Sequence, residues 1–319
     1  MLAPSRRRAA AWYRTRMNPT RRRALIAWVI VCFVWGTTYL AIRIALETLP
    51  PMLMAAFRWI IAGTIIAIAL KVRGERLPAV RAWPALAVLG VLLLGFGNGG
   101  VVFAELTVPS GLTAVLVATV PFWMVAIEAG RRGGDRVSAV GIAGLIVGFG
   151  GILLLVWPEI RFDGAGRRFI LGVAATQIAA IGWAIGSAYA RWRGHNEARS
   201  ENILVTAAFE MLFGGLALLT LGLVLGEWSK LMFSGRSLGA LAYLIFFGAI
   251  GGFGAYAYAL QHLPVATVSL YAYVNPVIAV VLGTLILDEP LTARVGVAAA
   301  IVLAGMFLVR RSETRMAEG

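Results

Sequence analysis

Ten apolar segments run through the sequence, and each is about as long as a helix that crosses a bilayer. Charged residues, prolines and glycines separate them. Their approximate ranges are 24–46, 51–70, 82–104, 110–129, 137–157, 169–190, 202–225, 238–260, 265–287 and 292–310. Inside lipid, only helices and closed barrels satisfy the backbone polar groups. Because the segments are continuously apolar and do not alternate, we predict an all-α membrane protein with ten transmembrane helices.

The composition excludes an ordinary soluble globule and gives no sign of nucleic-acid binding. The 319 residues are 60% hydrophobic and 14% charged, with a mean hydropathy of +0.83. The net charge of +14 comes from short basic runs between apolar segments, which orient membrane proteins, and no basic groove interleaved with aromatic residues is visible. The single cysteine, Cys32, permits neither an intramolecular disulfide nor a cysteine metal cluster.

The basic residues predict the orientation in the membrane. Residues 1–23 contain many arginines and no acidic residue. A full-length apolar span follows them, so we interpret them as a cytoplasmic tail and not as a cleaved signal peptide. With this tail inside, most of the Lys and Arg residues fall on the cytoplasmic side, and both termini are expected there. The eighth loop, Gln261-His262, departs from the pattern because it carries no Lys or Arg.

The second half of the chain repeats much of the first. The spacing of Pro109 and Pro121 recurs in Pro264 and Pro276. With five helices in each copy, the second copy must begin on the opposite side of the membrane, so the repeats are expected to be inverted. The predicted division is a basic tail 1–23, a first five-helix repeat 24–157, a second five-helix repeat 168–310 and a cytoplasmic tail 311–319.

Inverted repeats are typical of secondary transporters, in which substrate binds near the bilayer midplane between the repeats. The alternative is a structural or assembly protein that only uses this fold. Proline and glycine within the duplicated segments favour transport, since Pro121 and Pro276 free backbone carbonyls in mid-span. Gly97 and Gly252 pair at the same offset and permit close helix packing. We predict that these four residues act as hinges or packing points.

Aromatic and polar residues in the same segments predict a substrate site. Aromatic rings offer a stacking surface, while hydroxyl and amide groups orient an amphipathic solute. The candidate substrate-binding residues are Trp35, Thr38, Tyr39, Asn98, Thr119, Trp123, Trp183, Phe253, Tyr256, Tyr271 and Asn275. For each of them, packing or lipid contact explains the residue about as well as ligand contact. Other tryptophans, Trp59 among them, fit an interfacial belt better.

Two ionisable residues, Arg58 and Glu210, lie well inside apolar segments. Charge at such depth is costly and is functional by default. We expect the two side chains to be paired or to face a shared polar cavity, either as a structural ion pair or as a coupling site at which the carboxylate carries protons. Glu105 and Glu289 lie near helix ends, where ordinary solvation suffices, and Arg43 is expected to extend to the membrane surface.

No pattern in the sequence indicates catalysis, a metal or a cofactor. The only histidines, His195 and His262, lie in different loops and lack metal-binding spacing. Residues 95–100 match a dinucleotide-binding fingerprint, but no strand precedes them and they lie within an apolar span. We therefore expect a protein that is not an enzyme and has no cofactor.

Several motifs, taken together, resemble a known family. They are Trp35-Gly36-Thr37-Thr38, Pro50-Pro51 with Arg58, the paired proline stretches, Asp288-Glu289-Pro290-Leu291 and the Gly296 to Gly305 helix. The set is similar to ten-helix EamA-type members of the drug/metabolite transporter superfamily, over about residues 24–310. The resemblance implies an exporter of amino acids, related metabolites or drugs, with a cavity between inverted repeats. The first repeat departs from the pattern, since Gly133-Gly134-Asp135 lacks an acidic pair.

The sequence thus predicts a secondary transporter that exports small amphipathic metabolites across the bacterial inner membrane by alternating access. Amino acids, aromatic ones in particular, are the favoured class. The expected partners are a small-molecule substrate and the lipid bilayer, without nucleic acid, and the protein is expected to be a monomer or a homodimer. A multidrug exporter is the alternative within transport, and a scaffold or enzyme is the alternative outside it. Proton coupling and facilitated diffusion both stay open.

Overall fold

The computed structural model describes residues 19–130, 138–157, 164–194, 202–263 and 265–318. Within these ranges all regular secondary structure is helical, as the continuous apolar segments predict. Most of the predicted basic tail and the Gly133-Gly134-Asp135 stretch lie outside the described residues.

The first half of the chain forms a series of helices that follows the predicted apolar segments. They are α2 (Pro19–Ala45), α3 (Pro51–Val72), the 3-10 turn η1 (Val80–Ala82), α4 (Trp83–Gly90), the π-helix η2 (Val91–Asn98), α5 (Gly99–Ala104), α6 (Ser110–Val117), α7 (Val120–Gly130) and α8 (Ala139–Val156).

The second half has the same order of elements. They are α9 (Gly164–Gly194), α10 (Ile203–Val224), the 3-10 turn η4 (Glu227–Lys230), α11 (Gly235–Tyr243), the π-helix η5 (Leu244–Gly251), α12 (Gly252–His262), α13 (Val265–Val268), α14 (Tyr271–Leu287) and α15 (Ala293–Glu318).

Seven helical stretches in the described ranges are long and apolar enough to cross a membrane. They are Pro19–Ala45, Pro51–Val72, Val80–Ala104, Ser110–Gly130, Gly166–Ala190, Ile203–Val224 and Gly235–His262. Shorter apolar helices cover Ala139–Leu154, Tyr271–Leu287 and Ala293–Val309. Every predicted segment coincides with one of these stretches, so the multi-pass helical fold is confirmed. That all ten cross the bilayer, and that both termini are cytoplasmic, stay predictions.

Polar residues fix where several of the helices begin. The side chains of Ser138 and Asn202 accept hydrogen bonds from the first amides of α8 and α10, at 3.1 and 3.0 Å. Ser234 and Ser237 form a reciprocal capping box at the start of α11. Pro51 stands at the first position of α3, where a missing amide hydrogen costs nothing. These caps satisfy amides that have no partner within the helix.

A π-helix interrupts the third and the eighth predicted segments at corresponding places. η2 separates α4 from α5, and η5 separates α11 from α12. The residue that follows each is a glycine, Gly99 and Gly252, whereas the proline spacing had paired Gly252 with Gly97. The second copy is longer between this point and its proline, because α12 extends to His262 while α5 ends at Ala104. π-helical turns are rare and occur often at functional sites.

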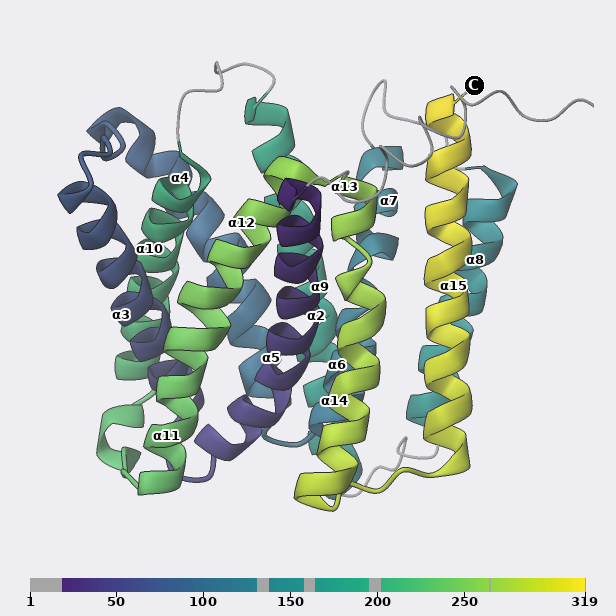
Figure 1. Ribbon diagram of the computed structural model, residues 1–319. Helices are drawn as coiled ribbons and strands as arrows, with labels where there is room; N and C mark the ends of the chain where they lie inside the picture. The colour runs from purple at the N-terminus through teal and green to yellow at the C-terminus, as the bar shows by residue number, and fades with distance from the viewer. Residues whose placement is uncertain (1–18, 131–137, 158–163, 195–201, 264, 319) are drawn as a thin grey trace, which may run out of the picture.

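The helices form two outer pairs around a central group. In Figure 1, α3 and α10 lie together on one side of the bundle and α8 and α15 on the other, with α2, α12 and α14 between them. Glycines allow the outer pairs to pack closely, since a Cβ at Gly305 would lie 2.5 Å from the backbone nitrogen of Gly148. The largest apolar core surrounds α3 and includes residues of α2, α10 and α11.

The chain turns at one end of the bundle at residues 46–50, 105–109, 225–234 and 288–292. We call it the outer end, because the predicted topology places it outside the cell. Hydrogen bonds tie the turns together, including one of 3.3 Å from the Met232 amide to the Thr48 carbonyl. The start of α2 and the end of α15 both lie at the opposite end of the bundle (Figure 1).

The two predicted proline hinges differ in structure. Pro121 is the second residue of α7, just after a break between α6 and α7 at residues 118–119. Pro276 lies inside α14, and the break in that segment comes earlier, between α13 and α14. Each segment is therefore discontinuous, as in transporter helices that line a site, although only Pro121 marks its break.

Candidate functional site

Three of the predicted substrate-binding aromatic residues meet around a fourth, Trp35 of α2. The Trp35 ring lies 5.5 Å from that of Phe253, 5.2 Å from that of Tyr256 and 5.0 Å from that of Tyr271, measured between centroids. Phe253 and Tyr256 come from α12, and Tyr271 is the first residue of α14. Tilted and edge-on contacts at these separations are favourable for aromatic pairs.

The π-helix η5 holds Trp35 in place. The Trp35 indole nitrogen donates a hydrogen bond of 3.1 Å to the carbonyl oxygen of Gly248. The same indole lies directly over Gly252, where any side chain would collide with it. The Trp35 indole therefore packs against Gly252, and the change of helix type at η5 coincides with a hydrogen bond from a side chain to the η5 backbone.

Trp59 extends this group, although we had expected it at the membrane interface. It is only 2% exposed, and its indole nitrogen donates a 3.0 Å hydrogen bond to Oδ1 of Asn98. Its ring lies 6.1 Å from that of Phe253. The interfacial interpretation of Trp59 was wrong, because helix depth alone does not tell which face of α3 is turned to lipid. We call Trp35, Trp59, Phe253, Tyr256 and Tyr271 the aromatic cluster.

The polar candidates near the cluster bond mainly to protein. The Thr38 hydroxyl donates to the Trp35 carbonyl at 2.7 Å, and the amide of Asn98 is engaged with Trp59. Asn275 is buried, and with its amide group oriented to satisfy its bonds it donates to the carbonyls of Tyr271 and Cys32, at 3.1 and 2.9 Å. Asn275 thereby joins α14 to α2. Tyr39 packs against the largest apolar core.

Two of the remaining candidates, Thr119 and Trp123, meet at Gln177 of α9, and a third, Trp183 of α9, lies against η2. The Trp123 indole donates to Oε1 of Gln177 at 3.1 Å, and the Thr119 hydroxyl lies at the same distance from that atom. Trp183 lies against Gly97, where an added Cβ would be 3.0 Å from the indole ring. In the described chain, no hydrogen bond or ring contact links this group to the aromatic cluster. We had not singled out Gln177, although a lone amide in an apolar span is a usable signal.

The structure does not bring Arg58 and Glu210 together. The Arg58 guanidinium lies 4.3 Å from the centroid of the Trp59 ring, and a Cβ at Gly248 would be 3.2 Å from its Nη2. The Glu210 backbone instead packs against Gly90 of α4. No ion pair joins the two side chains in the residues that the structure describes. Their predicted depths were compatible with contact, but they face different neighbours.

Glu105 is a buried ionisable residue near Arg58, and its burial was not predicted from the sequence. We had expected it to be solvated at a helix end, yet it is 0% exposed at the end of α5. Arg43, expected to extend outward, instead turns inward and donates to the Glu105 backbone carbonyl. Burial raises the pKa of the Glu105 carboxyl well above its usual value, while the nearby cations Arg43 and Arg58 oppose that rise and the Glu289 carboxylate adds to it.

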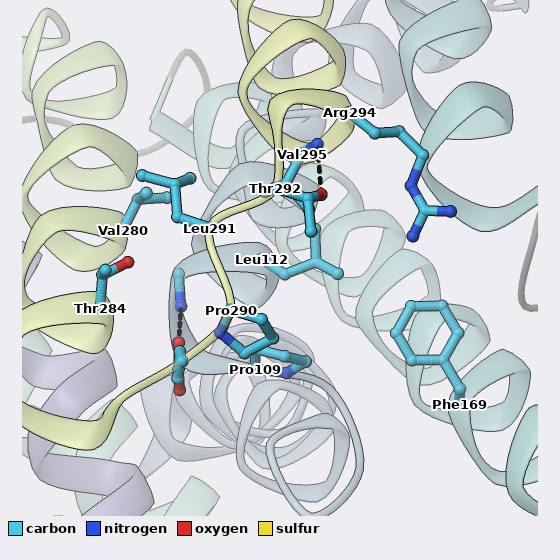
Figure 2. A pocket seen from close by; sticks show the side chains of 12 residues that line it. Pro109, Leu112, Phe169, Val280, Thr284, Pro290, Leu291, Thr292, Arg294 and Val295 are labelled. Atoms are coloured by element: carbon cyan, nitrogen blue, oxygen red, sulfur yellow. Dashed lines mark hydrogen bonds between the residues drawn. The ribbon is translucent and has the colours of Figure 1, made fainter.

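A pocket of about 120 Å³ opens at the outer end (Figure 2). Among its lining residues are Leu112 of α6, Phe169 of α9, Val280 of α14 and Arg294 of α15. None of the predicted substrate residues contributes to it, and its volume is below that of ordinary ligand sites, which hold roughly 300–1,000 Å³. It does not replace the aromatic cluster as the candidate site.

The Glu289 carboxylate beside this pocket caps a helix of the other half. It accepts hydrogen bonds from the backbone amides of Ser110 and Gly111, at 2.7 and 3.1 Å, where α6 begins. Asp288, with a left-handed φ of 52°, ends α14 and turns the chain toward α6. Gly283 leaves room for the carboxylate, since a Cβ there would meet Oε2. Among the described residues, no three His, Cys, Asp or Glu side chains gather to hold a metal ion.

Comparison with known proteins decides the family. The EamA-like transporter family matches the chain twice, over residues 22–157 and again over residues 170–311. The chain belongs to this family. The resemblance seen in the sequence is thereby confirmed, and the family domain is present in duplicate in this EamA-like transporter.

Two of the three relatives described next are themselves named as transporters. This EamA-like transporter is 34% identical over 278 residues to the uncharacterized inner membrane transporter YedA of Escherichia coli K12, covering 86% of this chain and 87% of YedA. It is 28% identical over 289 residues to the chloroplastic WAT1-related protein At3g02690 of Arabidopsis thaliana, covering 88% and 68%. The transporter YvbV of Bacillus subtilis is 25% identical over 300 residues, covering 91% and 89%.

A solved crystal structure has the same fold. It superimposes with a TM-score of 0.61 at 21% identity and covers 92% of this chain and 98% of its own. The EamA-like transporter is thus a multi-pass protein of the inner membrane, and the family and its relatives point to a transporter and not to an enzyme.

Proposed function

We propose that this protein is a secondary transporter that exports small amphipathic metabolites, with aromatic amino acids as the favoured substrates. The observation that carries the proposal is the origin of the aromatic cluster. Trp35 and Trp59 belong to the first half of the chain, whereas Phe253, Tyr256 and Tyr271 belong to the second. In secondary transporters, substrate binds where two repeats meet. The protein would act in the bilayer as a monomer or a homodimer.

Aromatic rings favour aromatic or amphipathic solutes. A planar substrate ring stacks on Trp or Tyr at a gain of about 0.5–1.5 kcal/mol for each pair beyond the area buried. The cluster also lies beside discontinuous helical segments, since η5 interrupts α11 and α12 and a break separates α13 from α14. Such breaks are typical of helices that line a transport site.

Contacts between the halves at the outer end support alternating access. The Leu53 amide donates to Oε2 of Glu227 at 3.0 Å, and Arg236 lies 3.2 Å from Glu47. The Glu289 cap on α6 is a third such contact. In each of them a residue of one half bonds to a residue of the other. In this conformation the two halves of the chain are therefore joined at the outer end. Release of substrate at that end requires these contacts to separate.

One observation favours a multidrug exporter as the second candidate. The uncharged polar groups nearest the cluster bond to protein, as Thr38, Asn98 and Asn275 do. A site with large aromatic surfaces and few free uncharged polar groups tolerates many apolar solutes. Such a protein would transport cationic dyes in preference to amino acids.

Growth of bacteria that express the protein separates the two candidates. We expect expression to raise tolerance to p-fluorophenylalanine, a toxic analogue of phenylalanine, and Trp35→Ala to abolish the gain. Trp228→Ala is the matched control, because Trp228 is 61% exposed and outside the cluster. Membrane levels of each variant are measured alongside. Tolerance to cationic dyes without any effect on the analogue would replace the amino-acid proposal with the multidrug one.

A further inference from the structure

Two buried charged side chains near the outer end have atoms without partners. Nε and Nη1 of Arg58, which is 3% exposed, make no hydrogen bond. The same holds for both carboxylate oxygens of the fully buried Glu105. The large majority of buried polar side-chain atoms in proteins have a hydrogen-bond partner, and leaving one without a partner is unfavourable. Two such groups together therefore need an explanation.

The two side chains interact electrostatically but do not form an ion pair. Each contributes to the electrostatic environment of the other. Yet none of their described nitrogen and oxygen atoms comes within the 4.0 Å that defines an ion pair. A buried guanidinium and a buried carboxyl group thus lie near one another, each with hydrogen-bonding atoms that have no partner.

Their surroundings keep the two groups apart. Arg58 is held by the face of Trp59 and by the close approach of Gly248 in η5. Glu105 ends α5, and its backbone carbonyl is bound by Arg43. The other charged neighbour of Glu105 is Glu289, whose carboxylate is engaged with the start of α6. Tyr39 of α2 also lies within electrostatic reach of Glu105. Of the Glu105 and Glu289 carboxylates, that of Glu105 is the one whose two oxygens both lack a hydrogen bond.

We infer that Arg58 and Glu105 bind the head group of a zwitterionic amino acid, Arg58 through the α-carboxylate and Glu105 through the α-ammonium. The inference rests on the proposed function and deepens it. A guanidinium with unused donors matches a carboxylate, and a carboxylate with two unused oxygens matches an ammonium. The ligand supplies one charge to each, so that neither stays buried alone.

The aromatic cluster continues from this charge site. Arg58 lies over Trp59, whose ring contacts Phe253, and Phe253 in turn contacts Trp35. A substrate with its head group at Arg58 and Glu105 therefore has its side chain beside aromatic rings. The substrate class that fits is a neutral α-amino acid with an aromatic or large apolar side chain. Both charged residues are buried, so the site is closed to solvent in this conformation.

Binding of three related probes tests the inference with the full-length protein in nanodiscs. The probes are L-phenylalanine, phenethylamine, which lacks the carboxylate, and 3-phenylpropionate, which lacks the ammonium. We expect wild type to bind phenylalanine at least tenfold more tightly than either analogue, since losing a charge leaves a buried group of the site unpaired. Equal affinities for the three probes in wild type would overturn the inference.

Substitutions assign each charge to its residue. Arg58→Gln is expected to lower the affinity for phenylalanine at least tenfold and to keep the affinity for phenethylamine within about twofold of the wild-type value. Glu105→Gln is expected to lower the affinity for phenylalanine by a similar factor and to leave the affinity for 3-phenylpropionate unchanged. A purely structural role would weaken all probes alike, and that result would overturn the inference. Arg58→Lys keeps the cation and should keep the preference for phenylalanine over phenethylamine. This comparison can be made even if Arg58→Gln is unstable.

A control variant and a second readout separate this inference from the proposed function. Arg167→Gln removes an exposed cation near the start of α9, away from the contacts between the halves, and should change none of the affinities. If wild type binds and transports phenylalanine but the Arg58 and Glu105 variants keep the wild-type probe preferences, only the head-group assignment fails. If wild type neither binds nor transports phenylalanine, the proposed function fails with it.

Discussion

Glu289 accepts a 2.7 Å hydrogen bond from the backbone amide of Ser110, so a carboxylate of the second half caps α6 of the first half. Glu227 does the same for α3, through the amide of Leu53. A carboxylate at a helix amino terminus satisfies amides without partners and interacts favourably with the helix dipole. Both caps lie at the outer end, where they hold the two halves together.

Removing the Glu289 cap should loosen the outer end. Glu289→Gln removes the negative charge from the α6 terminus, and we expect a loss of about 1 kcal/mol in the free energy of unfolding. Thermal unfolding in detergent, followed by tryptophan fluorescence, measures the shift. Glu47→Gln is the control, since its ion pair with Arg236 is exposed and is expected to contribute less. Equal stability of Glu289→Gln and wild type would contradict the capping role.

Glu227 should make stability depend on pH. Burial raises the pKa of its carboxyl above the ordinary 4.5, although the backbone amides of Leu53 and Met52 and the charge of Lys230 oppose the rise. The folded protein then binds this proton more tightly than the unfolded chain does. Its contribution to stability is therefore full below pH 4.5 and falls as pH rises toward the folded pKa.

Unfolding temperatures of wild type and Glu227→Gln, measured from pH 4 to pH 8, isolate this contribution. We expect the wild-type temperature to fall more steeply with rising pH just above pH 4.5 than that of the variant, which has no proton to lose at this position. Parallel profiles would show that Glu227 does not titrate differently in the folded and unfolded states.

Replacing Trp59 by Phe should destabilise the protein from within. The change keeps an aromatic ring but leaves Oδ1 of Asn98 without its 3.0 Å bond, at a cost of about 1–3 kcal/mol. Trp228→Phe, on the exposed surface, should leave the unfolding temperature unchanged. If Trp59 is a core residue, only Trp59→Phe should lower the unfolding temperature. Equal unfolding temperatures of the two variants would restore the interfacial interpretation of Trp59.

The contact of α8 and α15 depends on Gly305. A methyl group there would lie 2.5 Å from the Gly148 nitrogen, and overpacking of this kind costs about 1–3 kcal/mol. Gly305→Ala should therefore lower the unfolding temperature. Gly296→Ala in the same helix is the matched control, since nothing lies within 4 Å of its added Cβ. A drop of the same size in both variants would show a general intolerance of alanine in α15 and no specific contact.

Length and continuous apolarity predicted the helices well, because a bilayer-spanning segment must be long, apolar and helical. The segment 265–287 predicted from the sequence, for example, has the same outer bounds as α13 and α14 together. The π-helices were not predicted, because a π turn uses the same residues as an α turn and leaves no periodic signature over so few residues. Their positions follow from tertiary packing.

Residue type and segment predicted most members of the aromatic cluster, but not which helix faces are buried. Trp35, Phe253, Tyr256 and Tyr271 were chosen by residue type and segment, and the structure brings them together. Burial of Trp59 and Glu105 was missed, since sequence gives the depth of a residue along a helix but not the helix face that neighbours cover. The predicted pairing of Arg58 with Glu210 was wrong for the same reason, because the two residues face different neighbours.

Counterflow in proteoliposomes tests the central claim, that the protein carries an aromatic amino acid across the bilayer. Vesicles are loaded with unlabelled L-phenylalanine and diluted into a trace of radiolabelled L-phenylalanine, so neither an energy source nor a known orientation is needed. We predict a transient accumulation of label in vesicles with wild-type protein, and its loss with Trp35→Ala. Label uptake equal to that of protein-free vesicles, for phenylalanine and tryptophan alike, would contradict the claim.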